Sequence, residues 1–313
     1  MDILVFVLFA IGLLLIIKGG DYFVDAASWI AEVSGIPKFI IGATVVSIAT
    51  TLPELIVSAI AAFEGKPDMA IGNAIGSVTA NTGLIMAISI VCIPAAIRRS
   101  AYLVKSLLLI LAVAGMWIFS LSGQLSPIGC VALIIIFAVF IYENIQSAKK
   151  GASSERTKVQ GKREVWINLI KFIGGCAGIV IGANLLVDNG STIAAMIGIP
   201  ESVIAVTMIA IGTSLPELVT TITAIVKKQS ALSVGNIIGA NIIDTTLILP
   251  VCAVISGQTL PMSAQTFYVD LPICLLVIII MLVPALIQKK FSRWQGITSL
   301  LVYLSYLAYT FIA

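Results

Sequence analysis

The sequence predicts an all-α polytopic membrane protein with ten transmembrane helices, arranged as two inverted five-helix repeats with broken helices 2, 3, 7 and 8. Three observations support this fold class. Of the 313 residues, 59% are hydrophobic and only 11% are charged, whereas soluble domains carry about 25% charged residues. The apolar residues form ten long stretches, and one polar motif occurs twice at a fixed spacing.

The apolar stretches define the expected membrane spans, because a bilayer core about 30 Å thick requires roughly 20 apolar residues per helix. In chain order they are residues 3-17, 39-63, 69-96, 102-121, 126-145, 166-187, 202-226, 231-256, 268-288 and 295-312. They group into a first five-helix repeat, a linker and a second repeat, at residues 1-145, 146-165 and 166-313. The chain starts without the basic region and cleavage site of a signal peptide, so we expect the first span to be retained.

The basic residues predict the orientation in the membrane, because Lys and Arg collect on the cytoplasmic side. With Lys105 and Lys171 assigned to nearby cytoplasmic helix ends, 17 of the 18 basic residues fall in or beside the odd-numbered loops, and Lys66 is the exception. Both termini are therefore expected to be extracytoplasmic. The basic linker 146-165 is expected to be a solvated cytoplasmic connection, although it could also bind anionic lipid or a regulator. The compact chain and simple loop suggest a prokaryotic inner membrane.

The two halves of the chain repeat one pattern at a shift of 163 residues. Matching segments are "GIP" at 35–37 and 198–200, "LPEL" at 52–55 and 215–218, and "GN" at 72–73 and 235–236. Five helices per copy is an odd number, so the second copy must enter the membrane in the opposite orientation. Inverted repeats of this kind place a substrate site near the bilayer midplane, between the halves.

The "LPE" segments carry the most informative residues of the second and seventh spans. Pro53 and Pro216 lack a backbone N–H, so each should break its helix and leave carbonyl oxygens without helical partners. Such backbone is tolerated at membrane depth where it lines a cavity or binds a ligand. Beside each break lies a glutamate, Glu54 or Glu217, preceded by a pair of hydroxyl residues: Thr50 and Thr51, or Thr213 and Ser214.

The span after each "LPE" segment supplies a second polar stripe. In the first copy Ser77 and Asn81 are four residues apart, and in the second copy Ala240 and Asp244 have the same spacing. Residues four apart share one helix face. The glycines of these spans are expected to permit close helix contact: Gly72, Gly76, Gly235 and Gly239.

Three acidic residues are expected near the midplane: Glu54, Glu217 and Asp244. Burying each of them costs about 2.5–3.5 kcal/mol on the insertion scale, and no Lys or Arg is predicted at the same depth. Protonated carboxyls bonded between helices would be one explanation; a bound cation is the other. Carboxylate, hydroxyl, amide and carbonyl oxygens are hard ligands that suit Ca²⁺ or Na⁺ and disfavour soft transition metals.

These motifs resemble the paired repeats of the cation/Ca²⁺ antiporter superfamily, and most closely those of its sodium/calcium exchangers. "IGTSLPE" at 211–217 fits the family motif fully, while Ala49 and Thr51 replace the usual glycine and serine in the first copy. The resemblance covers nearly the whole chain. It implies a secondary active transporter that exchanges Na⁺ for Ca²⁺ by alternating access and exports Ca²⁺, with these ions as substrates.

The resemblance also implies roles for individual positions. Ca²⁺ would be coordinated by two glutamates and two threonines: Glu54, Glu217, Thr50 and Thr213. Na⁺ would be held by the hydroxyls of Thr51, Ser214 and Ser77 and by the backbone carbonyls of Ser47 and Ala210. Asn81 and Asp244 would complete the centre. In the family, the first and sixth spans slide as a pair against the rest. Five glycines would suit that contact, although ordinary packing explains them as well: Gly19, Gly174, Gly175, Gly178 and Gly182.

Two positions leave the coupling ions open. Ala240 stands where the family has a serine, which weakens the expectation of three Na⁺ per Ca²⁺. Asp244 is an acid where potassium-dependent relatives also have one, so K⁺ co-transport stays an alternative. A calcium/proton exchanger is a further alternative, although such proteins carry a glutamate where this chain has Gly76 and Gly239.

Other classes of protein are disfavoured by the sequence. A cation channel would show a continuous polar stripe instead of paired broken helices, and an enzyme is not expected because the chain has no histidine and no Ser-Lys or paired-Asp protease motif. The five cysteines lie in apolar segments without a C-x-x-C pair, so we expect them to serve packing. Membrane lipid is the expected surrounding, with no nucleic acid and no obligatory protein partner.

Overall fold

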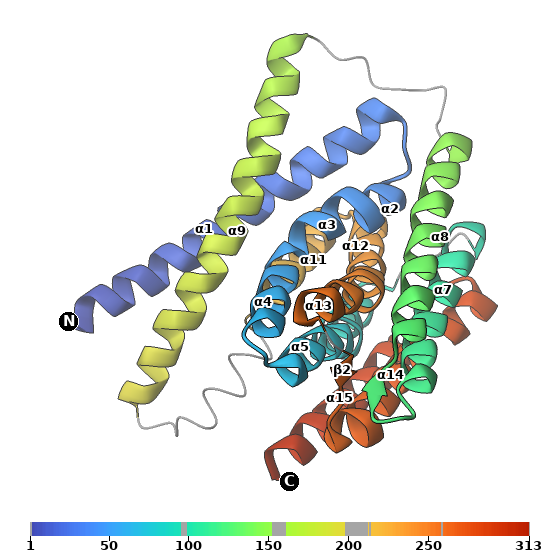
Figure 1. The fold of residues 1–313 in the computed structure, drawn as a ribbon. Helices are drawn as coiled ribbons and strands as arrows, with labels where there is room; N and C mark the ends of the chain where they lie inside the picture. The colour runs from blue at the N-terminus through green and yellow to red at the C-terminus, as the bar shows by residue number, and fades with distance from the viewer. Residues whose placement is uncertain are drawn as a thin grey trace.

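The computed structural model describes residues 2–94, 99–151, 161–197, 212, 214–257 and 259–312, and most of this length is helical (Figure 1). Two short strands, β1 (Gln124–Leu125) and β2 (Leu260–Pro261), pair antiparallel with Leu125 opposite Leu260. Seven described helices are long and apolar enough to cross a membrane, or eight if one bent pair counts as a span. The chain is therefore a multi-pass membrane protein, and ten spans in inverted repeats stay a prediction.

Two helices are much longer than the others: α1 (Asp2–Ser34) and α9 (Lys162–Met196). The expected spans 3-17 and 166-187 are therefore too short. The hydropathy of α1 falls at Lys18, but the helix continues because the charges from there onward lie on one side. Lys18 and Asp25 are exposed, whereas Phe23 and Val24 are buried.

Helices α1 and α9 cross each other beside the remaining helices and make close backbone contact (Figure 1). A Cβ atom added to Gly19 would lie 2.8 Å from the carbonyl oxygen of Gly175, and one added to Gly182 would lie 2.7 Å from that of Gly12. Most of the glycines predicted for a sliding contact thus join α1 to α9. Gly174 is different, because no described atom lies within 4 Å of its added Cβ.

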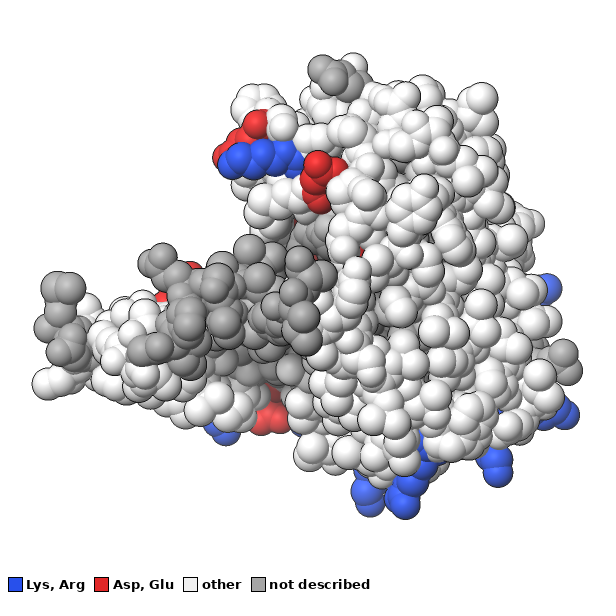
Figure 2. Space-filling model, turned by 90° about the horizontal axis from the view of Figure 1, so that it is seen from below, with Lys and Arg blue, Asp and Glu red and all other residues white. Residues whose placement is uncertain are grey.

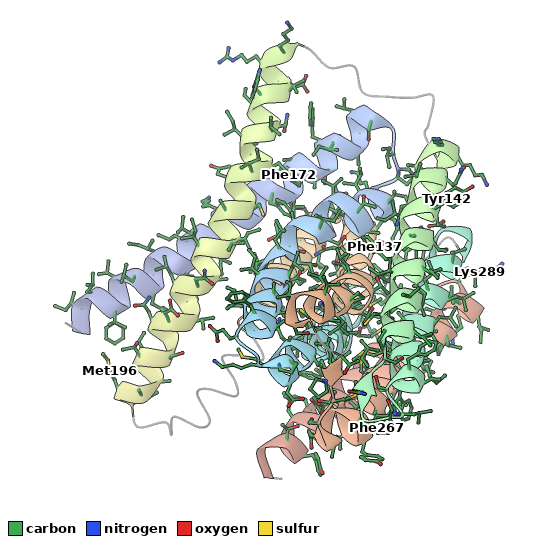
Figure 3. The ribbon with its side chains drawn as sticks, in the orientation of Figure 1. Phe137, Tyr142, Phe172, Met196, Phe267 and Lys289 are labelled. Carbon is green, nitrogen blue, oxygen red and sulfur yellow. The ribbon has the colours of Figure 1, made fainter. Side chains whose placement is uncertain are left out.

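Two side-chain contacts add to this pairing. The indole Nε1 of Trp29 on α1 donates a hydrogen bond of 2.8 Å to Glu164 Oε1 on α9. The ring of Phe172, which is labelled in Figure 3, lies 4.7 Å from that of Phe23 between centroids. We therefore treat α1 and α9 as one structural unit.

The second expected span is bent. It consists of α2 (Lys38–Ile41), the π-helical η1 (Gly42–Val46), α3 (Ser47–Thr50) and α4 (Leu52–Phe63). The parts before and after Thr51 differ in direction by 44°. Pro53 lies in the first turn of α4, where a helix requires no N–H donor. The carbonyl of Ala49, four residues earlier, is contacted by the Cys176 thiol at 3.7 Å, as expected for a carbonyl that lost its helical donor.

Two further spans are continuous. The first consists of α5 (Pro67–Ala80), η2 (Asn81–Met86) and α6 (Ala87–Cys92), and the second of α12 (Ser230–Ile243), η3 (Asp244–Ile248) and α13 (Leu249–Ser256). The expectation that helices 3 and 8 are broken is therefore wrong. Each contains a π-helical turn instead, and these turns begin at Asn81 and Asp244. A π-helical turn accommodates a local distortion without ending the helix.

The seventh span is described in its second half, α11 (Leu215–Val226). The described residues include four further helices: α7 (Arg99–Phe119), α8 (Pro127–Gly151), α14 (Leu271–Gln288) with the π-helical η4 (Thr266–Asp270) before it, and α15 (Arg293–Ile312). Helix α8 ends at Gly151 and α9 begins at Lys162, so both helices extend into the predicted linker 146-165.

The turns after α4 and α11 share one backbone conformation. Gly65 has φ +72°, and Lys228, which is 163 residues later, has φ +58°. Lys66 N donates to Ala61 O at 2.8 Å, and Gln229 N donates to Ala224 O at 2.6 Å. This is the hydrogen-bond pattern of a helix that ends in a left-handed residue. The repeat seen in the sequence thus extends to the local backbone.

The outer surface is suited to lipid. Large apolar side chains are exposed on it, including Phe63 and Val254, each at 82%. On the face seen in Figure 2, the Lys and Arg side chains lie toward the margins, and the broad area between them is formed by other residues. Charges at the margins and apolar residues between them are the arrangement expected of a membrane-spanning chain.

Candidate ion-binding site

Glu54 and Glu217 occupy equivalent places on two helices. Each lies in the first turn of its helix, α4 or α11, one residue after a proline. A negative charge at a helix N-terminus is favoured by the helix dipole. The two side chains are buried, at 1% and 0% exposure, and among the described residues neither has a hydrogen-bond partner for its carboxyl oxygens. Buried polar atoms without partners are unusual and call for a ligand.

The three predicted acids lie near one another. The carboxyl group of Glu54 interacts electrostatically with those of Glu217 and Asp244, and Asp244 also interacts with Glu217. Asp244, at the start of η3, is 1% exposed, and both of its carboxyl oxygens lack a partner. No cluster of three or more His, Cys, Asp or Glu residues in the described part of the chain could hold one metal ion. Any ion here must therefore be completed by hydroxyl, amide or carbonyl oxygens.

Such oxygens are present around the acids. The hydroxyls of Thr50 and Thr51 lie beside the Glu217 carboxyl group. Four buried side-chain oxygens among the predicted site residues have no hydrogen-bond partner: Thr51 Oγ1, Ser77 Oγ, Asn81 Oδ1 and Ser214 Oγ. Their oxygen atoms are therefore available to a cation.

The amide of Asn81 is held in place by the other half of the chain. Asn81 Nδ2 donates to Asn241 Oδ1 at 3.1 Å, and Asn241 Nδ2 donates to Thr82 Oγ1 at 2.8 Å. This chain of bonds occupies the nitrogen of Asn81 and leaves its oxygen free. Ala240, next to Asn241, is fully buried and contributes no side-chain oxygen.

Ser47 is buried in α3, and both of its oxygens have partners. Its backbone carbonyl, a predicted ligand, accepts a hydrogen bond of 2.9 Å from Thr51 N. Its hydroxyl donates to Thr44 O at 3.1 Å. Thr50 Oγ1 lies 3.4 Å from the same carbonyl oxygen, whose second lone pair is open to an ion when the Thr50 proton is directed to Asn236. Two other predicted ligands, Thr213 and Ala210, lie outside the described residues.

Two buried asparagines next to the acids were missed by the sequence reasoning. Asn73 Nδ2 donates to Ser58 Oγ at 2.9 Å and to the Glu54 carbonyl at 3.3 Å. Asn236 Nδ2 donates to Thr220 Oγ1 at 3.1 Å, and its oxygen accepts from Thr50 Oγ1 at 3.2 Å. The duplicated "GN" pair could have indicated both residues, because an asparagine follows the glycine at the same position of each repeat.

Glycines bring α12 against the bent span. A Cβ atom on Gly235 would lie 2.3 Å from the Phe39 carbonyl oxygen, and one on Gly239 would lie 2.6 Å from that of Ala43. This confirms the expected close contact for the second copy. For Gly72 and Gly76 of the first copy, no described atom lies within 4 Å of the equivalent position.

No Lys or Arg in the described part of the chain forms an ion pair with the acids of the site. Within the described residues, the ion pairs involve other acids, such as Glu143 with Lys105 and Asp25 with Lys227. Lys105 was expected at a cytoplasmic helix end, but its side chain is fully buried between α7 and α8, and its Nζ lies 5.4 Å from the Phe39 ring centroid. It pairs with Glu143 and makes no ion pair with Glu54, Glu217 or Asp244.

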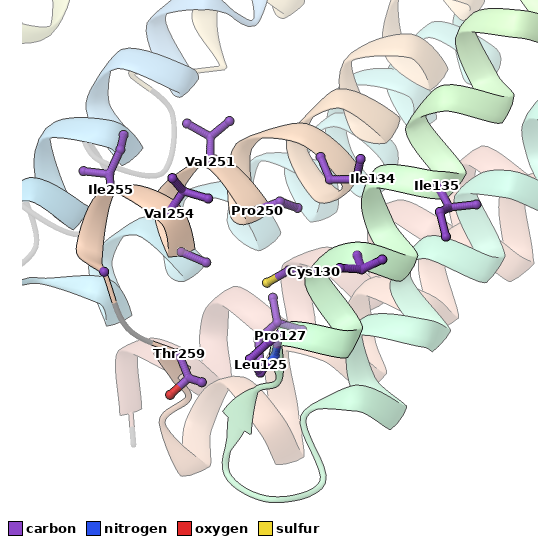
Figure 4. A pocket seen from close by; sticks show the side chains of 13 residues that line it. Leu125, Pro127, Cys130, Ile134, Ile135, Pro250, Val251, Val254, Ile255 and Thr259 are labelled. Carbon is purple, nitrogen blue, oxygen red and sulfur yellow. The ribbon is translucent and has the colours of Figure 1, made fainter.

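A separate groove lies between α8 and α13 (Figure 4). It has a volume of about 780 Å³ and an almost wholly apolar lining, with Thr259 as one of its few polar members. None of the three buried acids lines it. The groove is therefore distinct from the candidate ion site, whose oxygen atoms suit Na⁺ and Ca²⁺.

Comparisons with known proteins indicate the family of the chain. The profile of the family described as "Sodium/calcium exchanger protein" matches residues 4–146 and 167–312. The chain is 27% identical over 347 residues to sodium/calcium exchanger MaX1 of Methanosarcina acetivorans, covering 98% of each. It is 35% identical over 272 residues to inner membrane protein YrbG of Escherichia coli, covering 83% of each. The solved structure of the sodium-calcium exchanger NCX_Mj soaked without Na⁺ and Ca²⁺ matches with a TM-score of 0.86 and 32% identity, covering 99% of this chain and 100% of that one.

Proposed function

The chain belongs to the sodium/calcium exchanger family of the cation/Ca²⁺ antiporter superfamily, and from this premise we propose that it exchanges Na⁺ for Ca²⁺ and exports Ca²⁺. Membership makes it a multi-pass membrane antiporter for cations. The choice of Na⁺ as the coupling ion and the direction of transport are the proposed steps. Bacterial and archaeal relatives favour a prokaryotic membrane.

The observation that carries this proposal is the burial of three acids without partners. All six carboxyl oxygens of Glu54, Glu217 and Asp244 are buried and lack a hydrogen bond from the residues that the structure describes. Ionised acids at mid-membrane cost about 2.5–3.5 kcal/mol each, and a cation offsets this cost. If the acids were neutral structural groups, their oxygens would be expected to bond to neighbouring helices.

Exchange follows from competition for the same charges. Two ionised glutamates balance one Ca²⁺ or two Na⁺, so the site accommodates either load but not both together. A carrier that closes only when occupied then moves one load inward for each load outward. Three Na⁺ per Ca²⁺ would move one net charge, worth about 2.3 kcal/mol per 100 mV, and an inside-negative membrane would favour Ca²⁺ export.

The proposed ligands keep the roles that the sequence suggested. Ca²⁺ is held by Glu54, Glu217, Thr50 and Thr213. Na⁺ is held by the hydroxyls of Thr51, Ser77 and Ser214 and the carbonyls of Ser47 and Ala210, with Asn81 and Asp244 at the remaining central positions. Support comes from the unpartnered oxygens of Thr51, Ser77, Asn81 and Ser214.

The unit formed by α1 and α9 is the proposed moving part. Its internal glycine contacts and the bond between Trp29 and Glu164 support movement of both helices together. The unit meets the other helices through α1 and α11, where a Cβ on Gly20 would lie 2.8 Å from Thr223 Oγ1. We propose that the unit slides along this contact. We also propose that the chain forms two inverted five-helix repeats and that both of its termini are extracytoplasmic.

The test is Ca²⁺ uptake by the purified chain in proteoliposomes. Vesicles are loaded with Na⁺, K⁺ or acid, and ⁴⁵Ca²⁺ uptake is followed after dilution into buffer without that ion. We expect uptake driven by an outward Na⁺ gradient alone. Uptake driven by a proton gradient without Na⁺ would assign the chain to calcium/proton exchange, and a requirement for internal K⁺ beside Na⁺ would show potassium co-transport.

A further inference from the structure

Asn236 connects the two repeats beside the candidate site. Its side chain, on α12, is 1% exposed and bonds at both ends. The nitrogen Nδ2 donates to Thr220 Oγ1 on α11 at 3.1 Å, and the oxygen Oδ1 accepts from Thr50 Oγ1 on α3 at 3.2 Å. A buried amide with both groups bonded has a defined orientation and resists displacement.

The helix backbones fix the distance that this connection spans. Gly235, the residue before Asn236, packs so closely that a Cβ atom would lie 2.3 Å from Phe39 O, and Gly42 packs equally closely on Leu232 O. Contacts of this kind leave little freedom for α12 to move relative to the segment that carries Thr50. This packing therefore fixes the position of the Asn236 amide relative to Thr50.

The bond to Asn236 determines which way the Thr50 hydroxyl faces. A hydroxyl has one proton to donate and two lone pairs. The oxygen of Asn236 is the nearer acceptor at 3.2 Å, and the alternative, Ser47 O, lies at 3.4 Å. With its proton directed to Asn236, Thr50 keeps its lone pairs for an ion bound beside the Glu217 carboxyl group, which lies next to the hydroxyl.

The other end of Asn236 reaches the helix that carries Glu217. Thr220 Oγ1 donates to Pro216 O at 2.8 Å and lies 3.0 Å from the Glu217 carbonyl. It accepts the Asn236 amide in return. The Asn236 side chain thus joins the first turn of α11 to Thr50 of the first repeat.

We propose that Asn236 is a positioning residue for Ca²⁺: it sets the Thr50 hydroxyl so that its lone pairs meet an ion held by Glu54 and Glu217. This inference rests on the proposed function, because it assumes that Thr50 is a Ca²⁺ ligand. Asn236 itself does not touch the ion, and its effect passes through Thr50.

The equivalent asparagine of the first repeat provides a matched control. Asn73 Nδ2 bonds Ser58 Oγ and the Glu54 carbonyl, both on α4. These bonds remain within one repeat, and none of them involves Thr50. An Asn73 variant should therefore affect Ca²⁺ binding independently of Thr50.

The experiment is a double-mutant cycle on apparent Ca²⁺ affinity, measured by Na⁺-driven ⁴⁵Ca²⁺ uptake in proteoliposomes. Asn236→Leu and Thr50→Val are each expected to weaken affinity about tenfold, as for a lost interaction of roughly 1.4 kcal/mol. The double variant should be no weaker than Thr50→Val alone. Asn73→Leu combined with Thr50→Val should show the product of the two single effects.

Each outcome has one meaning. If the loss of Ca²⁺ affinity in the variant with both Asn236→Leu and Thr50→Val equals the product of the two single losses, the inference is overturned and the proposed Na⁺/Ca²⁺ exchange still stands. Absence of Na⁺-driven uptake by the unmodified chain would instead overturn the proposed function. If Asn236→Leu is too unstable to be assayed, Thr220→Val can replace it, because of the two bonds of Asn236 this change removes only the one from Nδ2 to Thr220 Oγ1. We expect a smaller loss of Ca²⁺ affinity from Thr220→Val, and no additional loss when it is combined with Thr50→Val.

Discussion

In the first repeat, α4 with Glu54 packs beside α5, which carries Ser77 and is followed by Asn81; in the second, α11 with Glu217 packs beside α12, which is followed by Asp244. Ala240 takes the place of Ser77 in the second repeat. The helices and their order agree, and the terminal turns agree in conformation. The acids on α4 and α11 are shared, while the oxygens on the following spans differ.

This difference separates two requirements of the site. Charge balance for Ca²⁺ requires two acids, and both repeats supply one in the same helical turn. We propose that the other oxygens of the site decide which monovalent ions fit, and there the repeats have diverged: Ser77 and Asn81 correspond to Ala240 and Asp244. We therefore expect substitutions of the shared acids to abolish transport and substitutions at the divergent positions to alter ion preference.

The largest expected effect is the loss of either shared acid. Glu54→Gln and Glu217→Gln should each lower Na⁺-driven ⁴⁵Ca²⁺ uptake by about 100-fold or more, since a lost charged ligand is worth at least about 2.7 kcal/mol. The amide keeps the shape of the side chain and removes its charge. The matched control is Glu64→Gln, which changes an exposed acid at the end of α4.

Unequal effects of Glu54→Gln and Glu217→Gln on Ca²⁺ uptake would contradict the equivalence of the two repeats. If Glu54→Gln abolished uptake and Glu217→Gln retained it, one acid alone would carry the divalent ion. The second repeat would then serve the monovalent ions, and the shared role of the two acids would be wrong.

The next effect concerns the close packing of α12. Gly235→Ala would place a methyl group 2.3 Å from the Phe39 carbonyl oxygen, and overpacking of this kind costs about 1–3 kcal/mol. We expect a lower melting temperature of the detergent-purified protein, together with weaker Ca²⁺ uptake. Gly174→Ala, on an exposed face of α9, should be neutral or stabilise by up to about 1 kcal/mol through helix propensity. Equal stability of the two variants would show that the contact at Gly235 can relax.

The third effect concerns the divergent position on α12. Ala240→Ser restores the hydroxyl that the first repeat has at Ser77. We expect a steeper Na⁺ dependence of uptake and an apparent Na⁺ affinity about threefold higher, which corresponds to roughly 0.7 kcal/mol. Ala177→Ser, on an exposed face of α9, is the control. An unchanged Na⁺ dependence would mean that this position does not contact the ion.

Much of the site could be predicted because its chemistry is local. The glutamates, their hydroxyl neighbours and the spacing of Ser77 and Asn81 follow from short segments that occur twice. Burial without a basic partner also follows, since an acid inside a long apolar stretch must lie within the membrane. The structure places Glu54, Glu217 and Asp244 close together, as the repeat suggested.

The features that could not be predicted depend on contacts between distant segments. Asn236 meets Thr50 across 186 residues, and no local pattern indicates that bond. The glycines at 19 and 175 indicated a close contact but not its partner, which is the other helix of the same unit. The sequence predicts the bend at Pro53, whereas the helix changes direction at Thr51 and Pro53 lies in the first turn of the next helix.

The smallest expected effect tests the equivalence of the two turns. Gly65 and Lys228 have the same left-handed conformation, which suits glycine and strains a side chain. Lys228→Gly should therefore raise the free energy of unfolding by about 0.5–1 kcal/mol, because relief of strain exceeds the greater backbone entropy of glycine. Gly65→Ala should lower it by a similar amount. Both shifts are measurable as melting temperatures in detergent, with Na⁺-driven uptake unchanged. A loss of stability in Lys228→Gly would mean that this exposed lysine makes a contribution that its counterpart in the first repeat does not.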